Sequence, residues 1–317
     1  MTRGKRNQAP DIEVRLLREG LVESTHRVQA VLCDERGRLL SVAGNSETSA
    51  FIRSALKPFQ ALAVTTTGIL ERYGLNDRDL AIICSSHQGT LAQIRQVFKI
   101  LWRCDVDPSA LQCPIPKGKQ SALEYNCSGK HAGMIAVCQQ RQWPIDTYLQ
   151  YNHPIQKLIL TQVAELMRMP PQELIIARDD CGAPTFLMQL GQMASLYAQL
   201  GSGDNLAMER IVRAMTHHPN LVAGEGAFDT ELIRLTDGEL VSKSGAEGIQ
   251  CISRVGMGLG MAIKVMDGAK RAKYAVAIQL LKQMGWITPS IAETLEEMFM
   301  NVSDISRLEV IGELSMM

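Results

Sequence analysis

The segments of this sequence that read as β-strands lie near its two ends, and a long stretch with helical spacing separates them. Apolar runs bounded by turn residues predict strands at 12–18, 24–33, 38–43, 239–243, 249–254 and 258–266. Apolar residues at helical spacing predict helices at 56–72, 91–103, 132–140, 153–168, 184–200, 269–283 and 289–299. We therefore predict an α+β fold in which the N- and C-terminal segments form a mainly antiparallel sheet, with the helical middle packed beside it.

The order of these segments excludes a doubly wound dinucleotide-binding fold, which would alternate strand and helix and begin with a glycine-rich turn. The comparable glycine run, 256–260, comes late and between strand-like segments, so we interpret it as a turn. A chain of 317 residues can enclose one core and one cleft. We predict a disordered N-terminal tail at 1–11 and a single catalytic domain at 12–317, with a helical lobe at about 54–235.

Charge and cysteine usage narrow the class of protein. The 33 basic side chains balance the 33 acidic ones, and the basic cluster Arg3 to Arg6 lies in the predicted tail, so we expect no nucleic-acid partner. The one long stretch without charged residues, 181–203, contains a proline and several polar residues, and no signal-like apolar run opens the sequence, so we expect a cytoplasmic protein without a membrane partner. The eight cysteines show no short regular framework and are expected to be free thiols.

Ser54 and Lys57 are the first candidates for chemistry. A serine and a lysine three residues apart in a helical turn share one face, and the amine can then take the proton of the hydroxyl. The lysine must be deprotonated to act, which requires burial or another cation nearby. Pro58 fits the first turn of a helix and so places Ser54 near a helix N-terminus, where amide dipoles favour an oxyanion. By itself, such a spacing arises by chance about once in a chain of this length.

A second lysine, Lys243, ends a predicted strand and precedes small residues that let a substrate approach the backbone. The segment resembles the Lys-Ser/Thr-Gly element of enzymes that also use Ser-x-x-Lys, and it follows Ser54 in the same order along the chain. The alternative is an exposed lysine before a glycine turn. Ser86, in Cys84–Thr90, is a candidate second hydroxyl that passes a proton to the leaving group, with His87 orienting it. An ordinary helix cap is the alternative here.

The segment Asn126–Gly133 gathers a thiol, an amine and an imidazole. Cys127 and His131 share a helical face and could bind zinc, but a catalytic zinc site needs at least three protein ligands. Asp179–Gly182, which contains Cys181, is the obvious source of another donor. A structural turn without metal remains the alternative on spacing alone.

Together these segments resemble the rhizobial-type L-asparaginases, the third structural class of L-asparaginases (L-asparaginase II family), related to serine-dependent glutaminases and to the penicillin-recognising, serine beta-lactamase-like fold. The resemblance runs from about Arg18 to Gly312. It rests on the segments Glu23–His26, Arg53–Gln60, Ser86–His87, Asn126–Met134, His153–Gln156, Asp180–Pro184 and Lys243–Gly248.

The resemblance implies an amidohydrolase with two serine-lysine pairs, which map onto Ser54 with Lys57 and Ser86 with Lys243. It also implies a zinc ion bound by Cys127, Lys130 and Cys181, so that Lys130 replaces His131 as the ligand, with Asp179 or Asp180 as a neighbour of these ligands. A homodimer is implied as well. The sequence departs from the family around Cys113–Pro116 and is shorter near 200–225, which bears on substrate preference.

The mechanism expected from these residues is attack of Ser54 on the side-chain amide of L-asparagine, with Lys57 as base and backbone N–H groups holding the oxyanion. Ammonia leaves with a proton relayed through Ser86 and Lys243. Arg53 and Glu247 are candidates to meet the substrate's α-carboxylate and α-ammonium, and His87, Asn126, Gly245 and Ala246 are further substrate-binding candidates. The alternatives are a glutaminase, a penicillin-recognising serine hydrolase, and a non-catalytic zinc-stabilised amino-acid-binding protein.

Overall fold

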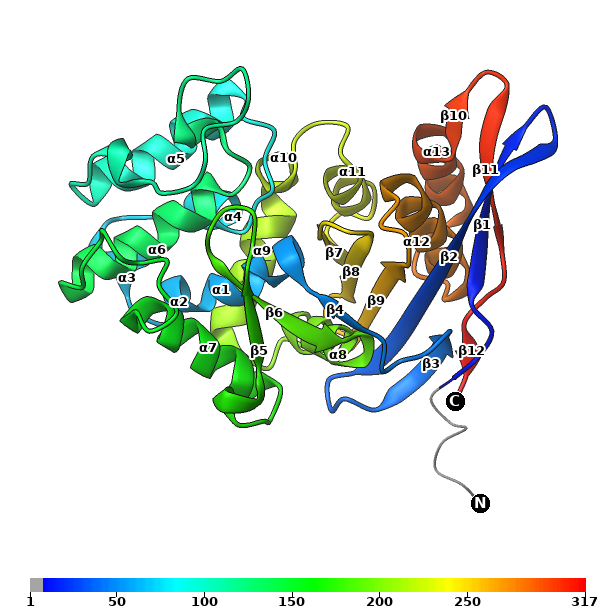
Figure 1. Ribbon diagram of the computed structural model, residues 1–317, viewed down its shortest axis with the longest axis horizontal. Coiled ribbons are helices and arrows are strands. Elements are labelled where there is room, and N and C mark those ends of the chain that lie inside the picture. Colours follow the sequence, from blue (N-terminus) through cyan, green and yellow to red (C-terminus); the bar gives the residue numbers. More distant parts are fainter. Residues whose placement is uncertain (1–7) are drawn as a thin grey trace. The chain divides into compact units, whose positions relative to one another are not determined.

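The computed structural model describes residues 8–317, which divide into two compact units (Figure 1). The sheet unit comprises the described residues up to Ala55, Met188–Gly203 and Glu231–Met317, and the helical unit comprises Leu56–Leu187 and Asp204–Thr230. Most of the predicted tail, including Arg3 to Arg6, lies outside the described residues. Ala9, at the start of the described part, donates a backbone hydrogen bond to the Gly44 carbonyl at 2.9 Å.

One antiparallel sheet forms the body of the sheet unit, and strands from the start and the end of the chain meet within it (Figure 1). Its order is β10 (Asn301–Ser303), β11 (Ser306–Ile311), β1 (Ile12–Arg18), β2 (Leu21–Asp34), β9 (Leu259–Val265), β8 (Ile249–Arg254) and β7 (Leu240–Ser244). β3 (Leu39–Ala43) pairs with β2 and with β12 (Ser315–Met316). Leu16 of β1 faces Leu308 of β11. The predicted α+β fold with a mainly antiparallel sheet is confirmed, and the six predicted strands are all present.

Helices pack on this sheet. Residues Val28–Asp34 of β2 are buried without alternation, which indicates that both faces of the sheet are covered there. α8 (Leu190–Leu200) and α12 (Lys270–Gln283) both contact β2, β8 and β9, and α13 (Pro289–Phe299) packs on α12. A Cβ on Gly260 would lie 2.1 Å from the Ala194 carbonyl oxygen, so β9 and α8 can approach this closely only with glycine at that position. The remaining elements are β4 (Ser49–Phe51), the short helix η2 (Arg53–Leu56) and α11 (Phe228–Leu235).

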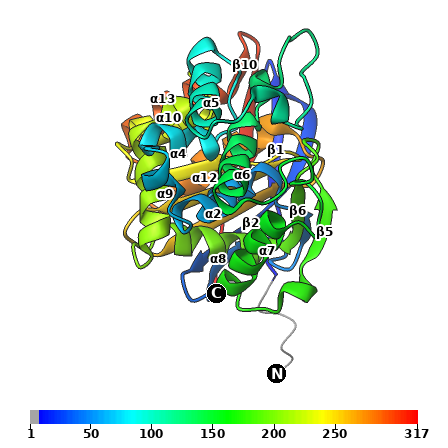
Figure 2. The ribbon, with the colours of Figure 1, turned by 90° about the vertical axis from the view of Figure 1, so that its left-hand side faces the viewer.

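α6 (Ser128–Arg141) is the central helix of the helical unit, and its residues Ser128–Cys138 are all buried. It packs against α2, α4, α5 and α7, as Figure 2 shows. A Cβ on Gly129 would lie 2.0 Å from the Ile82 carbonyl oxygen, so this glycine allows α6 to meet α4. The helices and strands of this unit are α1 (Lys57–Gln60), α2 (Leu62–Thr65), α3 (Ile69–Arg72), α4 (Asp77–Ile83), α5 (Leu91–Arg103), η3 (Pro108–Ala110), η4 (Ala122–Glu124), α7 (Pro154–Leu166), η5 (Pro171–Glu173), β5 (Ile175–Arg178), β6 (Pro184–Gln189), α9 (Leu206–His217) and α10 (Pro219–Val222).

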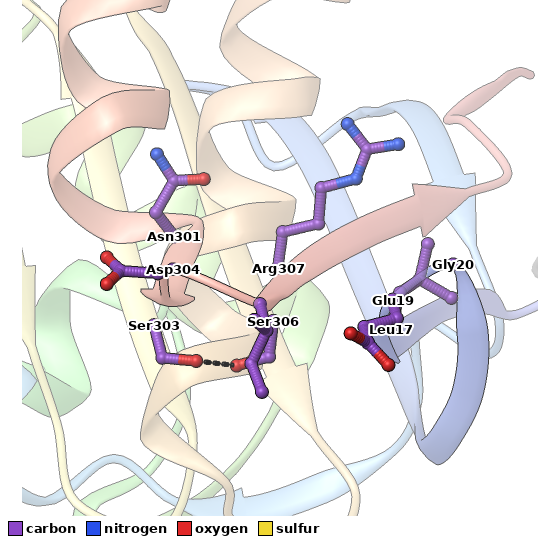
Figure 3. A pocket seen from close by; sticks show the side chains of 9 residues that line it. Leu17, Glu19, Gly20, Asn301, Ser303, Asp304, Ser306 and Arg307 are labelled. Atoms are coloured by element: carbon purple, nitrogen blue, oxygen red, sulfur yellow. Dashed lines mark hydrogen bonds between the residues drawn. The ribbon is translucent and has the colours of Figure 1, made fainter.

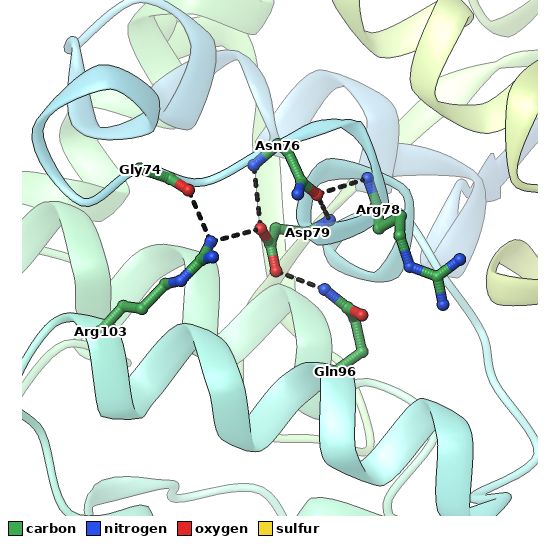
Figure 4. A network of polar contacts seen from close by, with 6 residues as sticks. All are labelled: Gly74, Asn76, Arg78, Asp79, Gln96 and Arg103. Atoms are coloured by element: carbon green, nitrogen blue, oxygen red, sulfur yellow. Dashed lines mark hydrogen bonds and ion pairs between the residues drawn. The ribbon is translucent and has the colours of Figure 1, made fainter.

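A buried carboxylate fixes α4 to α5 (Figure 4). Asp79 is fully buried; it accepts the Asn76 backbone N–H at 2.9 Å and hydrogen-bonds Gln96. Arg103 pairs with the same carboxylate at 3.2 Å. Asn76 in turn caps the first turn of α4, and Asp79 completes the capping box. The network anchors the helix that leads directly into Ser85 and Ser86.

Two helix predictions need correction. The helix predicted at 184–200 begins only at Leu190, because Pro184–Gln189 forms β6 and pairs antiparallel with β5. The helix predicted at 56–72 is three short helices, interrupted by Gly68 in the left-handed region at φ 75°. Among the described helices, none has the length and apolar character needed to span a membrane.

Candidate active site

Lys57 is fully buried at the start of α1 in the helical unit. Its amine lies 2.9 Å from the hydroxyl oxygen of Ser86 and 3.4 Å from the Asn126 carbonyl oxygen, and it also donates to the Ser85 carbonyl. These acceptors come from two segments far from Lys57 along the chain. The Lys57 amine is therefore in direct contact with Ser86, the serine that we predicted to pair with Lys243.

His87 is buried next to Ser86 and ties two loops together. Its Nδ1 accepts the Gly89 backbone N–H at 3.0 Å, which leaves Nε2 to donate to the Ser128 hydroxyl at 2.8 Å. Burial, together with the charge of nearby Lys57, lowers the pKa of His87 to about 3, so the imidazole is neutral. The ring contacts thus go to Ser128 and Gly89, and the backbone N–H of His87 donates to Asn126.

Three of the predicted residues meet at the start of α6. Cys127, Lys130 and Cys181 are all buried, and the Lys130 amine lies 3.1 Å from the Cys181 sulfur. A hydrogen bond from Cys181 lowers the pKa of Cys127 well below its usual range, with Lys57 and Lys130 adding to the effect. Despite its burial, the charges of the two cysteines raise the pKa of Lys130. Two sulfurs beside an amine form a sulfur-sulfur-nitrogen donor set of the kind that suits zinc.

His131 does not complete a metal site with these cysteines. In residues 8–317, no group of at least three histidine, cysteine or acidic side chains is arranged to hold a metal ion, so the Cys127–His131–Cys181 set suggested by spacing alone is not assembled. His131 instead pairs through Nδ1 with the Tyr148 hydroxyl at 2.6 Å. The set of Cys127, Lys130 and Cys181 differs from the set with His131 in that one of its donors is an amine.

In the sheet unit, the segment that carries Arg53 and Ser54 lies against the turn after β7. A Cβ on Gly245 would stand 2.8 Å from the Ile52 carbonyl oxygen, so the backbones meet here at a distance that only glycine permits. Arg53 and Ser54 are both half-buried, and Arg53 adopts the left-handed region at φ 53°. Residues other than glycine rarely adopt this backbone region, and those that do often lie at functional positions. The Lys-Ser-Gly segment and the Ser54 segment are thus neighbours.

Lys243 is fully buried in β7 and is framed by the residues on either side of it. The Gln250 amide on β8 donates to the Ser242 hydroxyl at 2.8 Å and accepts the Ser244 hydroxyl, also at 2.8 Å. Because alternate residues of a strand point to opposite faces, Lys243 points away from this clamp. Its own amine donates to the Ser244 carbonyl at 2.9 Å.

Ala246 and Glu247 form the exposed tip of the turn, and Glu247 is left-handed at φ 54°. Two lysines that the sequence analysis did not select also contact this turn. Lys264 of β9 donates to the Glu247 carbonyl at 2.8 Å, and Lys273 of α12 donates to the Gly245 carbonyl at 2.9 Å. Lys273 falls on the buried face of α12 at helical spacing with Val276 and Leu280. A charged residue on an apolar face was the signal that could have identified it.

The structure therefore gathers the candidates in two groups, one in each unit. The helical unit holds Lys57, Ser86, His87, Asn126, Cys127, Lys130 and Cys181, and the sheet unit holds Arg53, Ser54, Lys243, Gly245, Ala246 and Glu247. A surface pocket of about 390 Å³ in the sheet unit contains none of these residues (Figure 3). It is lined by Leu17, Glu19, Gly20, Asn301, Ser303, Asp304, Ile305, Ser306 and Arg307.

Three crystal structures described as Mglu match parts of this structure. "Crystal Structure Analysis of Mglu" is 15% identical over 82% of this chain and 67% of its own, with a TM-score of 0.46. The native form of Mglu in 4.3 M NaCl is 16% identical, and the match covers 82% of this chain and 61% of that one, with a TM-score of 0.45. "Crystal structure of Mglu in its L-glutamate binding form in the presence of 4.3M NaCl" is 16% identical, and the match covers 82% of this chain and 60% of that one, with a TM-score of 0.47. The chain thus spans about three fifths to two thirds of the length of these structures.

No curated protein matches the sequence. The model of the family described as L-asparaginase II matches residues 14–316, nearly the whole chain. This match covers both groups of candidate residues, and it agrees with the resemblance that the serine, lysine and cysteine motifs carry. The chain belongs to the L-asparaginase II family and is an amidohydrolase.

Proposed function

We propose that this enzyme hydrolyses L-asparagine to L-aspartate and ammonia through an acyl-enzyme on Ser54. The observation that carries the proposal is the fully buried Lys57, which lies three residues after Ser54 and 2.9 Å from the Ser86 hydroxyl. An amine that contacts a hydroxyl in a water-poor site can accept and return a proton. The family match restricts the chemistry to amide hydrolysis.

In this mechanism Lys57 takes the proton of Ser54 as its oxygen attacks the side-chain amide carbon, and backbone N–H groups hold the resulting oxyanion. The Lys57–Ser86 contact offers the proton a path to the leaving nitrogen, so that ammonia rather than an amide anion departs. Lys243 completes this relay in the proposal. Water then attacks the ester and releases aspartate, while the same groups return the proton to Ser54.

Free amino acids carry two charges that must be met when the substrate leaves water. We assign the α-carboxylate to Arg53 and the α-ammonium to Glu247, which lie in segments joined by the close contact between Ile52 and Gly245. Gly245 and Ala246 offer backbone groups beside them. In the helical unit, His87 and Asn126 shape the surroundings of Lys57 and Ser86 through their backbone and ring contacts.

We further propose that Cys127, Lys130 and Cys181 hold a zinc ion. The two sulfurs and the amine are buried together, and metal binding would require them to lose their protons. When bound, zinc would supply a fixed positive charge and a rigid cross-link between α6 and the Cys181 turn. Asn126, next to Cys127, accepts from Lys57, so this cluster holds a group that touches the proposed base.

A cytoplasmic location and a homodimer complete the proposal. All eight cysteines are buried thiols rather than disulfides, as is usual in a reducing compartment. The homodimer rests on the family and is tested by light scattering of the purified protein.

The decisive experiment measures ammonia release from L-asparagine and L-glutamine, and hydrolysis of an acyl-D-alanine ester, side by side. We expect asparagine to be preferred, and Ser54→Ala to lose activity while Ser290→Ala, an exposed serine, retains it. Mass spectrometry of quenched enzyme should show an acyl adduct on the peptide with Ser54. Near-normal ammonia release by Ser54→Ala would show that Ser54 is not the nucleophile. A preference for glutamine would identify the enzyme as a glutaminase, and asparagine binding without ammonia release would identify a non-catalytic binding protein.

The zinc proposal is tested by metal analysis of the purified protein. We expect zinc in the wild type and its loss in Cys181→Ser.

A further inference from the structure

The turn 245–248 between β7 and β8 is a strained segment whose shape is fixed from outside the hairpin. Glu247 and Gly248 are both left-handed, at φ 54° and φ 72°. Ala246 and Glu247 are exposed, whereas Gly245 and Gly248 are buried. The Ile249 N–H donates to the Ala246 carbonyl at 3.3 Å and closes this two-residue turn, but Glu247 is a non-glycine residue in a sparsely populated region, and the buried carbonyls at the ends of the turn still need partners.

Lys273 supplies those partners from α12. Its side chain is 3% exposed, and its amine donates to the carbonyls of Gly245 at 2.9 Å and Ile249 at 3.1 Å. Gly245 and Ile249 bound the turn on either side, and the Gly245 N–H donates back to the Ile249 carbonyl at 2.9 Å. A buried ammonium makes strong, charge-assisted hydrogen bonds, and it sets the separation of the two carbonyls that it bridges.

The first turn of α12 is itself anchored to β2. His26 Nδ1 contacts the Asp267 carboxylate at 2.6 Å, and the same carboxylate accepts the N–H of Ala269, the residue directly before α12. Arg271 donates to His26 Nε2 at 3.1 Å and to the Ser24 hydroxyl at 3.0 Å. The Ser24-x-His26 motif thus fixes the residues on both sides of the start of α12. Lys273 follows two residues after Arg271, so its position relative to the sheet is set by this anchor.

We propose that Lys273 is a positioning residue of this amidohydrolase: it holds the 245–248 turn in the conformation that receives the amino-acid group of the substrate. The inference rests on the proposed function, which assigns that group to the turn. Lys273 acts through Gly245 and Ile249 and does not touch the substrate. Its removal is therefore expected to weaken binding of substrate and transition state alike, which raises KM and leaves kcat nearly unchanged.

The test compares Lys273→Met with Lys270→Met, a matched change at an exposed lysine one turn earlier on α12. For Lys273→Met we expect KM for asparagine to rise about tenfold and kcat to change by less than about threefold. Lys270→Met should match the wild type. If folded Lys273→Met keeps the wild-type KM, the inference is overturned, whether or not its kcat and melting temperature fall. If Lys273→Met does not fold, Lys273→Gln, which keeps an uncharged NH2 donor group on a shorter side chain, carries the same test.

Hydrogen exchange of the unliganded enzyme separates this inference from the proposed function. In Lys273→Met the peptide that spans 243–250 should lose protection while peptides of the helical unit do not change. Equal protection in the variant and the wild type would refute the positioning role whatever the substrate is. If the wild type releases no ammonia from asparagine, the proposed substrate is lost, and the exchange result still decides whether Lys273 holds the turn.

Discussion

The two units each bury a candidate lysine completely, but they hold it in different ways. Lys57 begins a four-residue helix and depends on carbonyl and hydroxyl groups of segments 28 to 69 residues away. Lys243 lies in a strand whose flanking serines are clamped by Gln250 of the same hairpin. The first environment is assembled from distant loops, and the second from neighbours along one ladder. Changes near Lys57 should therefore disturb chemistry, whereas changes near Lys243 should first disturb stability.

The largest effect is expected when the loop-held lysine loses its amine. Lys57→Met removes the proposed base and leaves the Ser86 hydroxyl without this contact, so kcat should fall about 10³-fold. Steady-state ammonia release measures the loss, and circular dichroism checks that the variant folds. Lys157→Met, at an exposed lysine of the same unit, is the control. A fall of less than tenfold would show that Lys57 has only a structural role.

The hairpin-held lysine is tested through its clamp. Gln250→Leu leaves the buried Ser242 hydroxyl and the Ser244 hydroxyl without this partner, which should lower the free energy of unfolding by about 3 kcal/mol. Urea denaturation gives the value, and Gln150→Leu, at an exposed glutamine, should change it by less than about 0.5 kcal/mol. If Gln250→Leu were as stable as the wild type, the clamp would not distinguish the two environments.

Acid should act on the loop-held environment through His87. The pKa of His87 is about 3 in the folded protein and about 6.5 in the unfolded chain. As the pH falls below 6.5, His87 therefore binds a proton in the unfolded chain but stays neutral in the folded protein. The sign is therefore a loss of stability as pH falls, about 2 kcal/mol from this group between pH 6.5 and pH 5. Urea unfolding at pH 7.5 and pH 5 should show a smaller pH dependence for His87→Gln than for the wild type. The exposed His217→Gln should keep the wild-type dependence, and an identical slope in all three would contradict the assignment.

The smallest effect is expected at the close contact in the sheet unit. Gly245→Ala places a methyl group 2.8 Å from the Ile52 carbonyl oxygen and 2.9 Å from the Ile249 Cβ, so it should destabilise the protein by about 1.5 kcal/mol. Gly191→Ala in α8 meets its nearest neighbour at 3.5 Å and should be neutral or stabilising, since alanine favours a helix. Thermal melts compare the two. Equal melting temperatures would mean that the backbones at Ile52 and Gly245 can move apart.

The sequence predicted those parts of the molecule that depend on neighbours along the chain. The strands at 12–18 and 249–254 and the helices at 91–103 and 289–299 have the predicted bounds, because their apolar periodicity is local. The strand Pro184–Gln189 was predicted as helix, because its pairing with Ile175–Arg178 is a tertiary contact that periodicity does not reveal. β10 and β12 were not predicted because they are only three and two residues long, and β11, which lies between β10 and β1, was not predicted either.

The candidate site divides in the same way. Ser54, Lys57 and Lys243 could be selected because their spacing and flanking residues carry a chemical reason. The contact between Lys57 and Ser86 could not be foreseen, because it depends on how α4 delivers its C-terminal loop to α1. Lys273 was missed because a lysine within a predicted helix is usually exposed, and only its position on the buried face distinguishes it.

The pairing of β1 with β11 has a consequence for how the protein is made. Leu16 emerges early during translation, but its partner Leu308 is synthesised almost three hundred residues later. The residues of the helical unit, all before 231, are available to collapse well before that partner exists. Until then one edge of β1 remains an open template for other chains. We therefore expect nascent or truncated chains that lack 306–311 to depend on chaperones, and the finished sheet to form as a late and slow step of folding.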